Sequence, residues 1–229
     1  MKEVNEDRAG GDHALRRGYH ARRYAVLFYT LLLIMVAMPL FAAFGLSGAL
    51  IEFFLAASLL AAVMPVGTVG SRPALLTVTA LVWLARPLTA WFHNPALSVM
   101  TLGLWTLLGL FAAAGALRFA MSASQIDGEH LYAALSAYLL AGIFFGLFYW
   151  VLEQIAPGTF AAPGEFSRGS AVYFSFITLA TLGYGDIVPR TDVARGLAVL
   201  EGVGGQLFLA VMVARLVSLY VRDKPATKL

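Results

Sequence analysis

Residues Ser170 to Pro189 read SAVYFSFITLATLGYGDIVP, and this stretch decides the fold of the chain. Within it, Gly183 and Gly185 stand at alternate positions of the segment TLGYGD, residues 181–186. Glycine adopts a positive φ angle at little cost, so this spacing predicts a backbone that alternates between right- and left-handed conformations. Such a backbone can turn the carbonyl oxygens of consecutive residues toward one side.

A short helix of about three turns is expected directly before this loop, over residues 169–180. The negative end of its dipole would then face a cation held by the loop. Thr181 adds a hydroxyl oxygen at the inner end of the row, whereas Leu182 and Tyr184 are expected to turn their side chains into the protein. The pattern therefore predicts a site that binds a dehydrated cation through backbone oxygens. The alternative is a glycine-rich turn between two membrane spans.

The segment TLGYGD resembles the selectivity filter of the potassium channel family. In that family four chains each contribute one loop, and rings of carbonyl oxygens replace the hydration shell of potassium. The resemblance implies that potassium binds to the backbone carbonyls of residues 181–184 and that Asp186 lies at the outer mouth. Leu182 stands where valine or isoleucine is more usual. The filter residues implied are Thr181, Leu182, Gly183, Tyr184 and Gly185.

Further residues match positions that support the filter in this family. Tyr173 and Phe174 match pore-helix positions where aromatic side chains surround the filter tyrosine. Ile177 matches a position where some members carry a glutamate that bonds the outer acid, so the resemblance implies that this bond is absent here. Gly205 matches the inner-helix glycine proposed as a gating hinge, and close helix packing explains it equally well.

Two polar residues lie in the middle of the last apolar segment. A carboxyl or amide group within a membrane span is costly unless it faces water or a partner. Gln206 is expected to line the inner cavity. Glu201, a little more than one turn away, either belongs to the same cavity or bonds behind the filter in a protonated form. Gly142 and Gly146 are expected to form a packing face in the preceding span.

The composition identifies a membrane protein. Of 229 residues, 60% are hydrophobic and 13% are charged, against about 25% charged in soluble domains. The net charge of +3 is therefore taken as a signal of membrane orientation, with lipids and not nucleic acid as the surroundings. Because cysteine is absent, disulfides, thiolate metal sites and cysteine nucleophiles are excluded.

The expected fold is an all-α integral membrane protein with six transmembrane helices and a re-entrant pore helix and filter loop between the fifth and sixth. Twelve of the 16 lysines and arginines lie on the side of the two termini, which predicts cytoplasmic termini in a multi-pass protein of the cell membrane. The brevity of the chain suggests a bacterial inner membrane. Six apolar segments approach or exceed the roughly 17–25 residues that a spanning helix needs: 24–44, 49–66, 73–92, 96–120, 131–155 and 193–221.

The expected domain organisation places a sensor-like part before a pore part. The fourth span carries Arg118 as its single basic residue, whereas a voltage sensor needs several at regular spacing, so steep voltage gating is not expected. The expected units are a cytoplasmic N-terminal tail at 1–23, a four-helix sensor-like transmembrane domain at 24–120, a linker at 121–130, a pore domain at 131–221 with outer helix, turret, pore helix, filter and inner helix, and a cytoplasmic C-terminal tail at 222–229.

The turret, residues 156–168, contains two prolines and two glycines and is expected to be an irregular loop. Acidic residues near the outer mouth would concentrate cations there. For Glu153 and Glu165 the alternative is an ordinary solvated surface. The four acids of this group are Glu153, Glu165, Asp186 and Asp192.

The expected function is passive, potassium-selective conduction, with no cofactor beyond the permeant potassium ions. One loop cannot surround an ion, so a homo-oligomer is expected, by resemblance a tetramer. A weakly selective cation channel and a non-conducting or regulatory channel-like subunit are the alternatives. Residues 24–120 and 131–221 do not look alike, which disfavours a repeat-built transporter. No clustered nucleophile and base indicate an enzyme.

Overall fold

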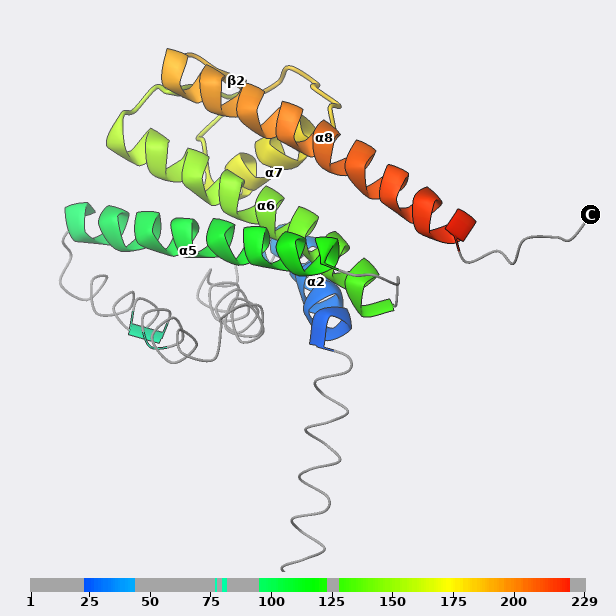
Figure 1. Ribbon diagram of the computed structural model, residues 1–229. Helices are drawn as coiled ribbons and strands as arrows, with labels where there is room; N and C mark the ends of the chain where they lie inside the picture. Colours follow the sequence, from blue (N-terminus) through cyan, green and yellow to red (C-terminus); the bar gives the residue numbers. More distant parts are fainter. Residues whose placement is uncertain (1–22, 44–76, 78–79, 82–94, 123–127, 223–229) are drawn as a thin grey trace, which may run out of the picture.

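The computed structural model describes residues 23–43, 77, 80–81, 95–122 and 128–222. Long helices dominate this part of the chain, and the short helix α7 contacts both α6 and α8 (Figure 1). In chain order the elements are α2 (Arg23–Ala43), α5 (Pro95–Met121), α6 (Gly128–Ile155), β1 (Phe160–Ala161), α7 (Arg168–Leu179), β2 (Val188–Pro189) and α8 (Asp192–Arg222).

Helix α6 is the centre of this arrangement, because it contacts α2, α5, α7 and α8. A continuous apolar core joins it to α2 and α5. Leu31 of α2, Ala116 of α5 and Leu140 of α6 are fully buried in this core. Alanines recur along α5 and α6, and such small side chains allow membrane helices to approach closely. The core thus holds α6 against α2 and α5, and it extends to Val172 of α7.

Three helices in the described ranges are long and apolar enough to cross a membrane, namely Ala96–Met121, Gly128–Ile155 and Asp192–Arg215. The apolar stretch Arg23–Ala37 of α2 is shorter. A helical membrane protein is therefore confirmed. The predicted count of six spans is not supported, because the expected second span, 49–66, and all but three residues of the expected third span, 73–92, lie outside the described residues.

The predicted all-α fold is wrong in one detail, since β1 pairs antiparallel with β2. Phe160 faces Pro189 and Ala161 faces Val188 in this two-stranded sheet. Strands of two residues are too short to show the alternating pattern by which strands are recognised in a sequence. The turret is therefore partly regular, and β1 joins it to the segment after the loop.

Helix α6 begins at Gly128, within the stretch predicted as a polar linker. Two tertiary contacts stabilise this polar first turn. The carboxylate of Glu129 accepts a hydrogen bond of 3.0 Å from the backbone N–H of Tyr24. The ring of His130 stacks on Phe119 of α5 with centroids 4.6 Å apart. The fifth span therefore starts three residues before the predicted position, because contacts with α2 and α5 replace solvent around polar side chains.

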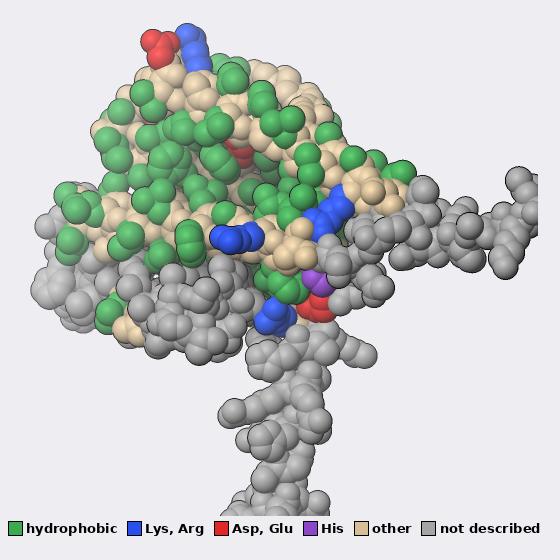
Figure 2. All heavy atoms as spheres, viewed as in Figure 1, with side chains coloured by type: hydrophobic (Ala, Val, Ile, Leu, Met, Phe, Trp, Pro, Cys, Tyr) green, Lys and Arg blue, Asp and Glu red, His purple; other side chains and the backbone are tan. Residues whose placement is uncertain are grey.

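Helix α8 differs from α6 in leaving large apolar side chains exposed along its length. Apolar side chains cover much of the molecule's surface in Figure 2. A patch of this extent requires cover by lipid or by another protein surface. The exposed large apolar residues of α8 are Val193, Val199, Leu200, Val203, Leu207, Leu209, Val211, Val213 and Val217.

Candidate functional site

Helix α7 carries the glycine-containing loop and is fixed at both of its ends. Ser167 caps the N-terminus, where its Oγ accepts a hydrogen bond of 3.1 Å from the N–H of Ser170. At the other end, the N–H of Ala180 donates to the carbonyl oxygen of Phe176 at 2.9 Å. The helix is therefore displaced by one residue from the predicted range 169–180.

Two glycines of α6 allow α7 to pack directly against its backbone. A Cβ atom added to Gly146 would lie 2.5 Å from the Cα of Val172, and one added to Gly142 would lie 2.6 Å from the ring of Phe176. A larger side chain at Gly146 would displace the backbone of α7, and one at Gly142 would displace the ring of Phe176. The prediction that these glycines form a packing face is confirmed.

Gly205 plays a similar part on α8. Its added Cβ would lie 2.8 Å from the carbonyl oxygen of Leu179, at the end of α7. Close packing thus accounts for this glycine, while the hinge role stays a prediction. Gln206, the next residue, is exposed. Its place in a cavity also stays a prediction.

The loop after α7 alternates in backbone handedness. Positive φ angles occur at Thr181 (57°), Gly183 (53°) and Gly185 (77°). The prediction of positive φ at the two glycines is confirmed, whereas the one at Thr181 was not foreseen. A left-handed threonine costs roughly 1–2 kcal/mol, since its Cβ crowds the following carbonyl. Thr181 lies two residues before Gly183, as Gly183 lies two residues before Gly185, so the alternation of the glycines could have predicted a positive φ at Thr181.

Hydrogen bonds to the last turn of α7 hold the start of the loop. The N–H of Thr181 donates to the carbonyl oxygen of Thr178 at 3.0 Å. The carbonyl oxygen of Ile177 accepts from Leu182 at 2.8 Å and from Gly183 at 3.3 Å. Three consecutive N–H groups are thereby turned toward the helix. The conformation of the loop depends directly on the position of α7.

The side chains of the loop lie on the surface of a single chain. Leu182 is 56% exposed and Tyr184 is 67% exposed. The expectation that both turn into the protein is therefore wrong for one chain alone. Apolar and aromatic side chains at such exposure require cover from outside the chain.

The three residues expected to support the loop differ in burial and in their contacts. Tyr173 is partly exposed, and desolvation followed by hydrogen bonding to the Asp186 carboxylate raises the pKa of its phenol. Phe174 is buried, with its ring 5.2 Å from that of Tyr149, and its role in supporting the loop stays a prediction. Ile177 is buried and contributes its backbone carbonyl to the loop. The Asp186 carboxylate therefore lies close enough to Tyr173 of α7 to influence the pKa of its phenol.

The turret braces the segment that follows the loop. The two carboxylate oxygens of Glu153 accept hydrogen bonds from the N–H groups of Gly158 (2.7 Å) and Phe160 (2.9 Å). The N–H of Arg190 donates to the carbonyl oxygen of Thr159 at 2.8 Å. Glu153 therefore stabilises the turret as a hydrogen-bond acceptor. Neither of the two predictions for it, a cation-concentrating acid and a solvated surface acid, included this role.

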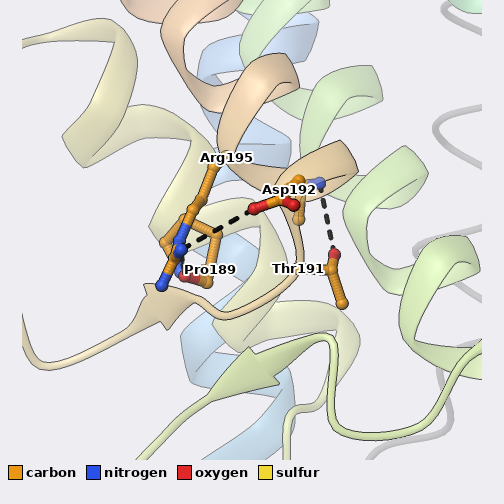
Figure 3. A network of polar contacts seen from close by, with 5 residues as sticks. Pro189, Thr191, Asp192 and Arg195 are labelled. Atoms are coloured by element: carbon orange, nitrogen blue, oxygen red, sulfur yellow. Dashed lines mark hydrogen bonds and ion pairs between the residues drawn. The ribbon is translucent and has the colours of Figure 1, made fainter.

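Helix α8 starts directly after β2 with a set of local polar contacts (Figure 3). Thr191 Oγ1 accepts a hydrogen bond of 3.3 Å from the N–H of Ala194, as an N-cap does. The Nε of Arg195 donates to the carbonyl oxygen of Pro189 at 3.2 Å, and its guanidinium lies 3.8 Å from the carboxylate of Asp192. Asp192 is thus paired at the surface.

A buried polar group lies behind the loop. Glu201 of α8 is 2% exposed and has its two recorded partners on two other helices. One carboxyl oxygen is hydrogen-bonded to Ser175 of α7, and the other accepts from the hydroxyl of Tyr149 of α6 at 2.7 Å. Of the two readings of Glu201, its contacts match the one behind the loop. Sequence reasoning missed both hydroxyl partners, although a serine in an apolar helix is a signal of such bonding.

The chemistry available at the loop is cation binding by oxygen. Alternating handedness can direct successive carbonyl oxygens to one side, and the Thr181 hydroxyl supplies one more oxygen. In the described ranges, no group of three or more His, Cys, Asp or Glu side chains is arranged to hold a metal ion. A cation at this site would therefore rely on backbone ligands.

Comparisons with known proteins agree with this geometry. Residues 134–222 match a family described as ion channel, a segment that includes α7, the loop, α8 and most of α6. Over 85 residues the chain is 34% identical to the inward rectifier potassium channel Kirbac3.1 of Paramagnetospirillum magnetotacticum. That alignment covers 37% of this chain and 28% of the relative. No solved structure matches the chain.

The two long helices, the short helix between them and the glycine-alternating loop define the membrane domain of an ion channel. Within that class, the C-terminal part of the chain is similar to a potassium channel, the inward rectifier named above. The similarity rests on the match of residues 134–222 to the ion channel family and on an alignment that spans a little over a quarter of the relative's length. It points to a channel and not to an enzyme.

Proposed function

We propose that four copies of this chain form a potassium-selective channel that passes ions passively down their electrochemical gradient. The observation that carries the proposal is the positive φ at Thr181, Gly183 and Gly185 in the segment TLGYGD. Rings of carbonyl oxygens from residues 181–184 of four chains replace the hydration shell of potassium. Asp186 lies at the outer mouth.

The exposed surface of the chain supports an assembly around a central axis. Leu182 and Tyr184 are uncovered in one chain, and so is the apolar surface of α8. A neighbouring copy covers the loop side chains, while copies of α8 and the surrounding lipid share the apolar surface. A closed symmetric ring also supplies the four carbonyls that one loop cannot.

The topology belongs to the same proposal. Both termini are cytoplasmic in a multi-pass protein of the cell membrane, with residues 24–120 as a sensor-like domain and 131–221 as the pore domain. Six spans include the three described here, and the family match covers the last two. Because the chain contains no cysteine, single cysteines at either end and in the turret report sidedness directly by labelling with an impermeant thiol reagent.

The test of function is ion flux from liposomes that contain the purified protein, compared with Gly183→Ala. An alanine at Gly183 meets no atom within 4 Å in one chain, so within the chain the substitution acts through the positive φ. We expect potassium flux with little sodium flux in the wild type, and loss of potassium flux in the variant. Gly158→Ala is the matched control, because Gly158 also has a positive φ of 86° with open space around it but lies in the turret.

Other outcomes separate the alternatives. Equal potassium and sodium flux would favour a weakly selective cation channel. Absence of flux from a stable assembly, at every voltage applied, would favour a non-conducting or regulatory channel-like subunit. An equal loss in Gly158→Ala and Gly183→Ala would show that the effect comes from misfolding and not from the loop.

A further inference from the structure

The buried contact between Glu201 and Ser175 joins all three helices of the pore segment. Glu201 lies on α8, Ser175 on α7, and the Ser175 hydroxyl also contacts the backbone carbonyl of Gly142 on α6 at 2.7 Å. The hydroxyl of Tyr149, again on α6, donates to the second carboxyl oxygen of Glu201. The short helix that carries the loop is therefore bonded to the helix on each side of it.

The hydrogens in this network can be counted. A serine hydroxyl has one hydrogen to donate, and a backbone carbonyl can only accept. Because the Ser175 Oγ lies 2.7 Å from the carbonyl oxygen of Gly142, its single hydrogen is used there. The contact between Ser175 and Glu201 then needs a hydrogen from the carboxyl group. The geometry fits a protonated Glu201 that donates to Ser175 and accepts from Tyr149.

The surroundings of Glu201 give no support to a charged form. Both of its recorded partners are hydroxyl groups, and no cationic side chain among the described residues pairs with it. The single charged residue of α7 is Arg168, and its guanidinium lies over the ring of Trp150. A buried carboxylate without a cation is costly inside a membrane, whereas a neutral carboxyl group with both oxygen atoms hydrogen-bonded costs much less.

We infer that Glu201 is a positioning residue for the filter, and that it holds α7 in place as a neutral hydrogen-bond donor to Ser175. The inference rests on the proposed function insofar as it concerns ion selectivity. Ser175 lies two residues before Ile177, whose carbonyl oxygen accepts from Leu182 and Gly183 at the start of the loop. A shift of α7 at Ser175 therefore moves the acceptor that sets the first turn of the loop.

The deciding comparison is Glu201→Gln against Glu201→Ala. A glutamine side chain has the shape of a protonated glutamate, with an N–H group that can donate to Ser175 and an oxygen that can accept from Tyr149. We expect Glu201→Gln to keep the wild-type ratio of potassium to sodium flux. Loss of the buried bonds in Glu201→Ala should lower that ratio about tenfold, the change that one lost buried hydrogen bond typically produces. Ser175→Ala should resemble Glu201→Ala.

A second measurement does not depend on conduction. The infrared difference spectrum between the wild type and Glu201→Gln, at neutral pH, isolates this carboxyl group from the other acids among the chain's 13 Asp and Glu residues. We expect the wild type to show the carbonyl band of a protonated carboxyl group that the glutamine variant lacks. This band is present whether or not the protein conducts, so a failure of the proposed function is distinguishable from a failure of this inference.

Either of two results would overturn the inference. One is a Glu201→Gln variant as impaired as Glu201→Ala, which is expected if a carboxylate must accept from both hydroxyls. The other is a difference spectrum in which the wild type shows carboxylate bands and no protonated carboxyl band. If Glu201→Ala fails to assemble, the glutamine variant and its spectrum still decide the question.

Discussion

Helices α6 and α8 flank the same short helix, yet they are buried to very different extents. On α6, Leu140 and Phe144 are fully buried. On α8, Leu200 and Leu207 are more than 60% exposed, and the buried positions in its described part are Ala194, Glu201 and Gly205. The apolar windows of the two helices have the same mean hydropathy. Composition therefore does not distinguish a helix that is packed within its own chain from one whose cover comes from outside.

This difference divides residues 128–222 into two sides. Helix α6, the turret and α7 form a unit that is complete within one chain, from the core with α2 and α5 to the aromatic cluster of Tyr149, Phe160 and Phe174. The loop and α8 form the incomplete side. Substitutions on the first side should destabilise the single chain, whereas matched substitutions on the second side should act on assembly.

The largest effect is expected at the contact between α6 and α7. In Gly146→Ala the new methyl group lies 2.5 Å from a backbone atom of Val172, so one helix has to move. Overpacking lowers the free energy of unfolding by about 1–3 kcal/mol. We expect a loss near the upper end of this range, because a backbone atom cannot avoid the clash by changing rotamer as a side chain can. The measurement is the free energy of unfolding by denaturant titration in detergent.

Gly204→Ala on α8 is the control for this change. Its Cβ has open space within the chain, and alanine favours a helix over glycine by about 1 kcal/mol. The single chain should therefore unfold at the same or a higher denaturant concentration. Equal destabilisation by both glycine substitutions would show that the two sides of α7 do not differ as described.

A smaller effect is expected from Leu140→Ala on α6 compared with Leu207→Ala on α8. Leu140 is fully buried, so its truncation leaves a cavity, whereas Leu207 is 61% exposed in one chain. Because lipid is as apolar as leucine, the cavity term dominates and the loss at Leu140 should be about 2 kcal/mol, near the lower end of the usual range. Unfolding measurements on dissociated chains should show no loss for Leu207→Ala.

The same pair of variants tests the assembly. Leu207→Ala should increase dissociation of the oligomer, seen by light scattering in detergent, if copies of α8 cover this surface. A Leu207→Ala variant with unchanged dissociation would assign the surface to lipid. If Leu140→Ala instead lost no stability, the division into a complete and an incomplete side would be wrong.

The sequence predicted those features that depend on local backbone or on length. The short helix before the loop, the positive φ at Gly183 and Gly185, and the packing of Gly142 and Gly146 follow from residue type and spacing. The sheet between β1 and β2 was not predicted, because its strands are only two residues long and its paired residues lie 27 and 29 positions apart in the sequence. The exposure of Tyr184 was also missed, since burial of that ring depends on chains other than its own.

Polar contacts between distant residues were the hardest to predict. Glu201 was recognised as a costly mid-span carboxyl group, but its partners Tyr149 and Ser175 lie on helices whose relative rotation the sequence does not specify. Glu153 was considered with the acids of the outer mouth, although its hydrogen bonds are to N–H groups only a few residues ahead. An acid before a Pro-Gly turn is the signal that such capping leaves in a sequence.

The smallest of these effects is expected at the turret brace. In Glu153→Gln one carboxylate oxygen becomes an amide N–H₂ group, so it cannot accept from both Gly158 and Phe160. One hydrogen bond is lost at a position near the surface, and the free energy of unfolding should fall by about 1 kcal/mol. Since β1 holds the segment after the loop through β2, hydrogen exchange at the N–H of Arg190 should also become faster.

Glu165→Gln is the matched control for this prediction. Glu165 lies in the same turret and is exposed, and its recorded hydrogen bond uses only the backbone carbonyl, which the substitution keeps. It should leave both stability and exchange at Arg190 unchanged. If Glu165→Gln and Glu153→Gln instead lowered cation flux equally while leaving exchange unchanged, these acids would act through their charge at the outer mouth, and the turret would not belong to the braced, self-contained side of the chain.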